Sequence, residues 1–245
     1  MLLVLDVGNS YFKCAVYEDN KLLRQYQFLE KEAFLELENI FTFFSKINKT
    51  VLSQVAELRF EVKKCIEKHS ELVLISHKTK LPFVNKYTTP NTLGVDRMVL
   101  AAGACIKYPN QNVLVIDAGT CVTFDIISSQ NEYLGGAISP GLRMRYKALH
   151  HFTNKLPLLE TQYPEDLVGN STANAIHSGV VNGLLAEIEH VISQYFLKYS
   201  QLTIILTGGD TNFLAKRLKS TIFADANFLL ESLYLLSLYS THAND

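Results

Sequence analysis

The order of apolar and polar positions is the same in two stretches of the chain. Each stretch begins with three predicted strands in close succession: 2–7, 11–17 and 21–28 in the first, and 112–120, 121–128 and 132–139 in the second. In both, an apolar run ends at Asp-x-Gly and a short turn leads into the next strand. The pattern therefore predicts one α/β unit that occurs twice.

Helical spacing of apolar residues follows each triplet of strands. The predicted helices cover 31–47, a charged segment between the next two strands, a nearly fully buried run after Arg97, a segment from about Pro140, a long amphipathic stretch over 172–199, and 228–240. Further strands are predicted at 50–56, 71–77, 202–210 and 221–224. We expect an N-terminal domain of residues 1–111 and a C-terminal domain of residues 112–245.

Composition narrows the class of partner. The 245 residues carry a net charge of −1, so nothing in the charge balance favours nucleic acid or an anionic membrane. The apolar run from Met1 to Leu5 stops at Asp6, which is too short for a signal peptide. No window is long and apolar enough for a membrane span. We expect a soluble, cytoplasmic protein.

The cysteines give no sign of a disulfide framework or a zinc site. Cys14, Cys65, Cys105 and Cys121 lie far apart in apolar surroundings, and none of them forms a CxxC pair. Buried free thiols are the expected state.

The first turn, DVGNSYFK, has the residue types that hold phosphate. Gly8 lets the backbone approach a phosphate, Asn9 and Ser10 supply donors, and Lys13 supplies positive charge. Asp6 would orient Mg²⁺ through water. The alternative is an ordinary β-hairpin turn.

The same turn recurs at 116–120 as IDAGT, which favours the functional interpretation. Two such turns would offer backbone amides and one carboxylate each to a polyphosphate and its metal ion. Neither a Walker A motif nor GxGxxG occurs in the chain.

Two other segments allow both a functional and a structural interpretation, and a third contains a candidate helix cap. LTGGD (206–210) could seat a base or ribose, or form an ordinary strand-to-helix turn. Asp96 falls in the first turn of a buried helix, where it could act in catalysis or simply favour the helix end. Asn170 or Ser171 could cap the long helix.

The histidines carry little information. A structural role is expected for His177, which has no partner in the sequence, and the roles of His150 and His151 stay open.

Five motifs in this order carry a resemblance to a known family: DVGNSYFK, YTTPNTLGVDR, IDAGT, GNSTANAIHSG and TGGD. Together they resemble type III pantothenate kinases, within the acetate kinase, heat-shock ATPase and actin superfamily. The resemblance implies an α/β fold of two duplicated actin-like, ribonuclease H-like domains with a central cleft. It also implies ATP-dependent phosphorylation of pantothenate to 4′-phosphopantothenate, the first step of coenzyme A biosynthesis.

The resemblance also assigns residues. ATP would be held by Asp6, Val7, Gly8, Asn9, Ser10, Tyr11, Phe12, Lys13 and Thr120. Pantothenate would contact Tyr87, Gly94, Val95, Asp96, Arg97 and Thr172. Asp96 would be the general base, Asp117 would bind K⁺ or NH₄⁺, and Thr172 would be donated across a homodimer interface. Two alternatives are a kinase for another small acceptor and a non-catalytic, nucleotide-binding regulatory module of the same fold.

Overall fold

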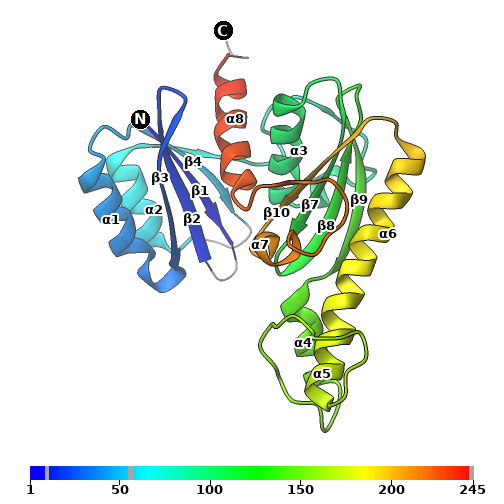
Figure 1. Cartoon of the computed structure of the whole chain (residues 1–245). Coiled ribbons are helices and arrows are strands. Elements are labelled where there is room, and N and C mark those ends of the chain that lie inside the picture. Colours follow the sequence, from blue (N-terminus) through cyan, green and yellow to red (C-terminus); the bar gives the residue numbers. More distant parts are fainter. Residues whose placement is uncertain (9–10, 55–57, 243–245) are drawn as a thin grey trace. The chain divides into compact units, whose positions relative to one another are not determined.

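The computed structural model describes residues 1–8, 11–54 and 58–242. The chain forms two compact units, Met1–Pro109 with Asn227–Asp245, and Asn110–Ala226 (Figure 1). The domain ranges 1–111 and 112–245 stay a prediction and differ from this division, since the C-terminal helix packs within the first unit.

The first unit is built on a mixed sheet in the order β3-β2-β1-β4-β5. Its strands are β1 (Leu2–Val7), β2 (Tyr11–Glu18), β3 (Lys21–Leu29), β4 (Lys49–Gln54) and β5 (Glu71–Leu74). Its helices are α1 (Ala33–Phe43), α2 (Phe60–His69), α3 (Val95–Lys107) and α8 (Phe228–His242), with short elements η1 (Glu30–Glu32), β6 (Val84–Asn85) and η2 (Pro90–Thr92). The strands β1, β2 and β3 are antiparallel, whereas β4 and β5 run parallel to β1.

The second unit repeats this topology in the strand order β9-β8-β7-β10-β11. Its strands are β7 (Asn112–Ala118), β8 (Cys121–Ile127), β9 (Glu132–Pro140), β10 (Leu202–Thr207) and β11 (Phe223–Ala224). Its helices are α4 (Leu142–His151), α5 (Thr172–His177), the π-helical segment Ser178–Asn182, α6 (Gly183–Lys198) and α7 (Thr211–Leu214). Again three strands are antiparallel and two run parallel to the first. The predicted duplicated α/β architecture is confirmed.

Strand alternation divides the first sheet into two faces. Leu3, Leu5 and Val7 point to the face covered by α1 and α2 (Figure 1), where they join one hydrophobic core. The intervening residues, Val4 and Asp6, therefore lie on the opposite face, on which α3 and α8 pack. The first carboxylate of the duplicated turn is thus placed under helices rather than in open solvent.

The long amphipathic helix is present but interrupted. Ile176, Val180, Leu184 and Ile188 are buried in the core of the second unit, as their spacing predicts. The predicted single helix over 172–199 is instead two α-helices joined by one π-helical turn. Such a turn inserts a residue without breaking the helix axis, which hydrophobic spacing does not reveal.

Other element boundaries shift for local reasons. The predicted strand 202–210 ends at Thr207, because Gly208 has φ +96°, outside strand geometry. The predicted helix 31–47 is shorter, since a 3₁₀ turn occupies Glu30–Glu32 and the α-helix ends at Phe43.

Two sequence expectations concern bulk properties. Within the described part of the chain, no helix combines the length and apolar character that a membrane span requires. Cys14, Cys65 and Cys105 are buried free thiols, as expected, and Cys121 is a half-buried one.

The close approach of α3 to α8 gives a stability prediction. A Cβ on Gly103 would lie 2.4 Å from Ser232 Cβ and 2.8 Å from Ser232 Cα, so the two helices would have to separate. We expect Gly103→Ala to lower the free energy of unfolding by ~1–3 kcal/mol. Urea denaturation followed by circular dichroism measures it.

The matched control is Gly183→Ala in α6, where an added Cβ meets nothing within 4 Å. There alanine should raise stability, by up to ~1 kcal/mol, through helix propensity alone. Equal effects of the two substitutions would show that α3 and α8 do not pack as tightly as described.

Candidate functional site

A row of three polar side chains crosses the first sheet where β1 ends. Asp6 pairs with Lys13 on β2 and with Ser53 on β4. Directly paired residues point to the same side of a sheet, so all three side chains lie on the face covered by α3 and α8. The register thus brings a carboxylate, an ammonium and a hydroxyl together.

Asp6 is desolvated. Its side chain is 8% exposed, and the Ser53 hydroxyl donates a 2.7 Å hydrogen bond to Asp6 Oδ1. Burial raises the pKa of Asp6 to about 6, with a smaller increase from the negative charge of Asp96 and opposing effects of Ser53 and Lys13. The two carboxylates, 90 positions apart in sequence, are therefore close enough within one unit for their charges to interact.

The turn after β1 closes through the backbone. The Gly8 amide donates to the Tyr11 carbonyl at 3.2 Å, and a Cβ on Gly8 would lie at the same distance from that oxygen. Asn9 and Ser10, both predicted to bind ATP, lie outside the described residues.

Two further predicted ATP-binding residues, Val7 and Phe12, have buried side chains in the hydrophobic core beneath α1 and α2. Any contact of theirs with ATP would therefore use backbone atoms.

Asp96 is held by the start of α3. Its Oδ1 accepts a 2.8 Å hydrogen bond from the Arg97 amide. Gly94 precedes the helix, and a Cβ there would lie 2.4 Å from Asp96 Oδ1, so this carboxylate position requires glycine. The preceding turn is fixed by His77, whose Nε2 donates to the Leu93 carbonyl at 2.8 Å.

Arg97 and Tyr87, both predicted to contact pantothenate, lie together. The Arg97 side chain is buried, and its guanidinium carbon is 5.8 Å from the Tyr87 ring centroid. The Tyr87 amide donates to Asn85 Oδ1 at 2.9 Å, which fixes the loop that carries the ring. Val95 is the first residue of α3.

The second unit has an equivalent row with different chemistry. Asp117 pairs with Thr123 on β8 and Thr207 on β10. Both hydroxyls are buried and have no hydrogen-bond partner among the described residues. A Cβ on Gly208 would lie 2.3 Å from Asp117 Oδ1, so the backbone passes directly over this carboxylate. Unpartnered buried oxygens are rare and call for a ligand or a water.

The turn of the second unit is also closed by its backbone. The Gly119 amide donates to the Cys121 carbonyl at 2.9 Å, and the Gly141 amide donates to the Thr120 carbonyl at 3.2 Å. The exposed Thr120 side chain is thus presented on a fixed loop. In the neighbouring TGGD segment, burial raises the pKa of Asp210 to about 6.

Thr172 is the exposed first residue of α5. Ser171 caps this helix, since its Oγ accepts the Asn174 amide at 3.2 Å. His177 and the Tyr146 hydroxyl share a buried 2.8 Å hydrogen bond, as expected for a structural histidine. Ser171, and not Thr172, therefore caps the helix.

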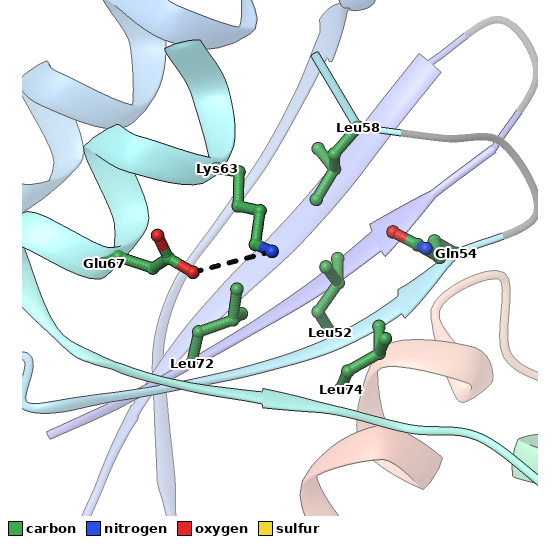
Figure 2. A pocket seen from close by; sticks show the side chains of 7 residues that line it. All are labelled: Leu52, Gln54, Leu58, Lys63, Glu67, Leu72 and Leu74. Atoms are coloured by element: carbon green, nitrogen blue, oxygen red, sulfur yellow. Dashed lines mark ion pairs between the residues drawn. The ribbon is translucent and has the colours of Figure 1, made fainter. Parts of the chain in front are cut away.

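A pocket of about 320 Å³ lies elsewhere in the first unit (Figure 2). Leu52, Leu72 and Leu74 line it beside the Lys63–Glu67 ion pair. Leu52 points to the α1/α2 face of the sheet, whereas its neighbour Ser53 points to the face that carries Asp6. The pocket is thus separate from the polar row.

The sequence analysis missed Ser53, Thr123 and Thr207. Ser53 is the last buried residue of β4 and Thr207 is the last residue of β10, and each strand runs parallel to the strand that carries the aspartate. A hydroxyl residue at the end of a buried run was the available signal, but its partner depends on strand order and register.

The chain is similar to known proteins over most of its length. The profile of the family described as type III pantothenate kinase matches residues 2–194. A type III pantothenate kinase of Flavobacterium johnsoniae is 50% identical over 233 residues, which are 95% of this chain and 96% of that protein.

Two solved structures share the fold. One is a putative Baf family transcriptional activator from Campylobacter jejuni, with a TM-score of 0.64 and 24% identity over 98% of this chain and 99% of that chain. The other is a glucokinase from an Antarctic psychrotroph, with a TM-score of 0.53 and 12% identity over 98% of this chain and 99% of that chain.

Desolvation of Asp6 predicts a pH dependence. Between the ordinary pKa of 3.8 and the folded value of about 6, the folded chain keeps a proton that the unfolded chain has lost. Stability from this group is therefore present at low pH and is lost as the pH rises through 6. Asn does not titrate. The free energy of unfolding of Asp6→Asn, relative to that of wild type, should therefore increase by ~1.4 kcal/mol as the pH rises from 5 to 8.

Urea denaturation of both proteins across this range tests it. Ser53→Ala, which removes a hydrogen bond that favours the carboxylate, should make the wild-type dependence steeper. A stability difference between Asp6→Asn and wild type that stays constant from pH 5 to pH 8 would show that the carboxyl is not desolvated.

Proposed function

The chain belongs to the type III pantothenate kinase family, and on this premise we propose how its own residues transfer a phosphoryl group from ATP to pantothenate. The product would be 4′-phosphopantothenate, at the first step of coenzyme A biosynthesis. The observation that carries the proposal is the placement of two carboxylates, Asp6 and Asp96, with Lys13 on one face of the first unit.

Asp96 is proposed as the general base. The primary hydroxyl of pantothenate is a weak nucleophile until it loses its proton. As its oxygen attacks the γ-phosphorus, the O–H proton would pass to the Asp96 carboxylate, the bond from phosphorus to the bridging oxygen would break, and ADP would leave. The Arg97 amide on Asp96 Oδ1 leaves the second oxygen, Oδ2, for this proton.

The turn between β1 and β2 is proposed to hold the ATP phosphates. Backbone amides around Gly8 and the ammonium of Lys13 would supply the donors and the positive charge. Tyr11, which is exposed, can contribute its side chain. Asn9 and Ser10, which lie outside the described residues, belong to the same proposed contact by their sequence.

Asp6 fits a role toward Mg²⁺. Its carboxylate is buried, its pKa is raised, and a second negative charge lies near, so a bound cation would stabilise its ionised form. When bound with ATP, the metal neutralises charge on the phosphates. Asp6 would hold it through water, in line with the preference of Mg²⁺ for keeping part of its hydration shell.

Asp117 fits a monovalent cation, K⁺ or NH₄⁺. Its neighbours in the sheet are the buried hydroxyls of Thr123 and Thr207, which have no hydrogen-bond partner among the described residues, so the row offers two oxygens that a cation could take as ligands. The backbone at Gly208 passes close to the carboxylate and narrows the site. Thr120, on the adjoining turn, is proposed to contact ATP.

Pantothenate recognition is proposed for the residues around the start of α3. Gly94 and Val95 would approach it with backbone atoms, while Tyr87 and Arg97 would supply a ring and a positive charge for its carboxylate. Thr172, exposed at the start of α5, would reach pantothenate from the second chain of a homodimer.

A non-catalytic regulatory module of the same fold is the alternative. The acceptor residues argue against it, because Tyr87, Asp96, Arg97 and Thr172 are all present. Gly94 leaves room for the Asp96 carboxylate, because a Cβ at position 94 would lie 2.4 Å from Asp96 Oδ1. A module without turnover would have no need for this geometry.

The proposal is tested by mixing the full chain with ATP, Mg²⁺ and pantothenate in K⁺ or Na⁺ buffer and following ADP release. We expect ADP only with pantothenate, and faster in K⁺. Asp117→Asn should lose the advantage of K⁺ over Na⁺, whereas Asp166→Asn, an exposed aspartate of the same unit, should retain it. No ADP from folded protein would favour the regulatory module, and a K⁺ advantage retained in Asp117→Asn would remove the cation from this residue.

Asp96→Asn isolates the proton-transfer step. Asn keeps the shape of the side chain but cannot take the proton, so turnover should fall by about 10²–10⁴-fold. ATP affinity and the unfolding transition should stay close to wild type. The matched control is Asp19→Asn in the exposed β2–β3 turn, at the other end of these strands, where φ is +47° and Asn is well tolerated. Turnover in Asp96→Asn equal to the control would exclude Asp96 as the base.

A further inference from the structure

A second group of ligand-type side chains lies in the first unit, away from the proposed kinase site. Glu38 comes from α1, and Cys65 and His69 come from α2. One ligand atom from each, a carboxylate oxygen, the thiol sulfur and a ring nitrogen, lies within 4.8 Å of the other two.

Helix geometry explains the convergence. Cys65 and His69 are four residues apart, so they lie on the same side of α2, one turn apart. The helices α1 and α2 pack against each other, which brings Glu38 to the same place. His69 Nε2 is 3.2 Å from Glu38 Oε2. The Phe41 ring stacks on the imidazole at 4.8 Å between centroids and 11° between planes, which fixes the orientation of the ring.

The three donors have the chemistry that zinc selects. Zn²⁺ binds thiolate, imidazole and carboxylate, and sites with three protein ligands leave a fourth position for water. The Glu38 and His69 side chains are each 28% exposed, so an ion can enter from solvent, whereas Cys65 is 3% exposed. We propose that Glu38, Cys65 and His69 bind one Zn²⁺, with a water molecule completing the tetrahedron.

Binding requires two exchanges at the site. Burial and the charge of Glu38 raise the pKa of Cys65 to about 12, so the thiol carries its proton in the metal-free protein. Zinc would take the sulfur as thiolate, and that proton would be released to solvent. The ammonium of Lys68, 3.6 Å from Glu38 Oε1 and 67% exposed, would move into solvent as the ion replaces it.

The zinc site is separate from the proposed kinase site. Cys65 belongs to the core on the α1/α2 face of the sheet, whereas Asp6 and Ser53 lie on the α3/α8 face. Its effect would be to join α1 to α2, because it links residues of two helices. Binding should therefore raise the stability of the folded chain rather than supply a reacting group.

The experiment uses the full chain without an affinity tag, stripped of metal. Zn²⁺ is titrated against a chromophoric chelator, and Co²⁺ is titrated separately to detect the thiolate-to-metal charge-transfer absorption. We expect one Zn²⁺ per chain and, with Co²⁺, a charge-transfer band. Cys65→Ser should abolish the band and weaken Zn²⁺ binding by at least about 100-fold. The matched control is Cys105→Ser, another buried thiol, which should change neither.

Two positions nearer to solvent, His69 and Lys68, keep the test valid if Cys65→Ser is destabilised. His69→Gln should weaken zinc binding to a similar degree without unfolding the chain, and Lys68→Met should tighten it several-fold by removing the competing ammonium. Stoichiometric binding that survives both Cys65→Ser and His69→Gln would overturn the site. So would the absence of binding to folded wild-type protein at micromolar Zn²⁺.

Discussion

The desolvated carboxylate of Asp6 is the constraint on which the first unit depends. It is the penultimate residue of a strand whose other residues are apolar, and α3 and α8 cover the face on which it lies. A buried carboxylate costs free energy unless it gains hydrogen bonds and positive charge. Ser53 and Lys13 provide part of both, and the raised pKa shows that they do not provide all. The Mg²⁺ ion of the proposed site would supply the positive charge that is still missing.

Duplication supplies two such carboxylates, and their neighbours differentiate them. The strand order and register are the same in both units, so Asp117 occupies the place of Asp6, Thr123 that of Lys13, and Thr207 that of Ser53. The position paired with the aspartate on the second strand thus carries an ammonium in the first unit and a hydroxyl in the second. This difference is consistent with the proposal that the first row serves a phosphate with its metal ion and the second a monovalent cation. One topology thus produces two different rows by changing two side chains, Lys13 to Thr123 and Ser53 to Thr207.

Hydrophobic periodicity predicted most of the helices and strands and their buried faces. The two triplets of strands, the core side of α6 and the burial of α3 all follow from spacing, because each element buries one face or is buried throughout. What the sequence could not supply depends on tertiary contact. The grouping of α8 with the first unit follows from its packing on α3, where Gly103 faces Ser232. The hydroxyl partners of the two aspartates follow from register. Candidate residues on the two turns were accessible from the motif alone, although two of them proved to have side chains in the core.

The same limit explains why spacing between cysteines indicated no metal site. A zinc motif is recognised in sequence when its ligands are close along the chain, whereas Glu38 is 27 residues before Cys65 and joins it only by the packing of α1 on α2. The sheet separates this cluster from Asp6. A metal ion bound there could therefore affect the kinase site only by stabilising the first unit. The proposed zinc site lies among the helices on one face of the sheet, and Asp6, Lys13 and Ser53 lie on the other, so one sheet separates the two proposed sites.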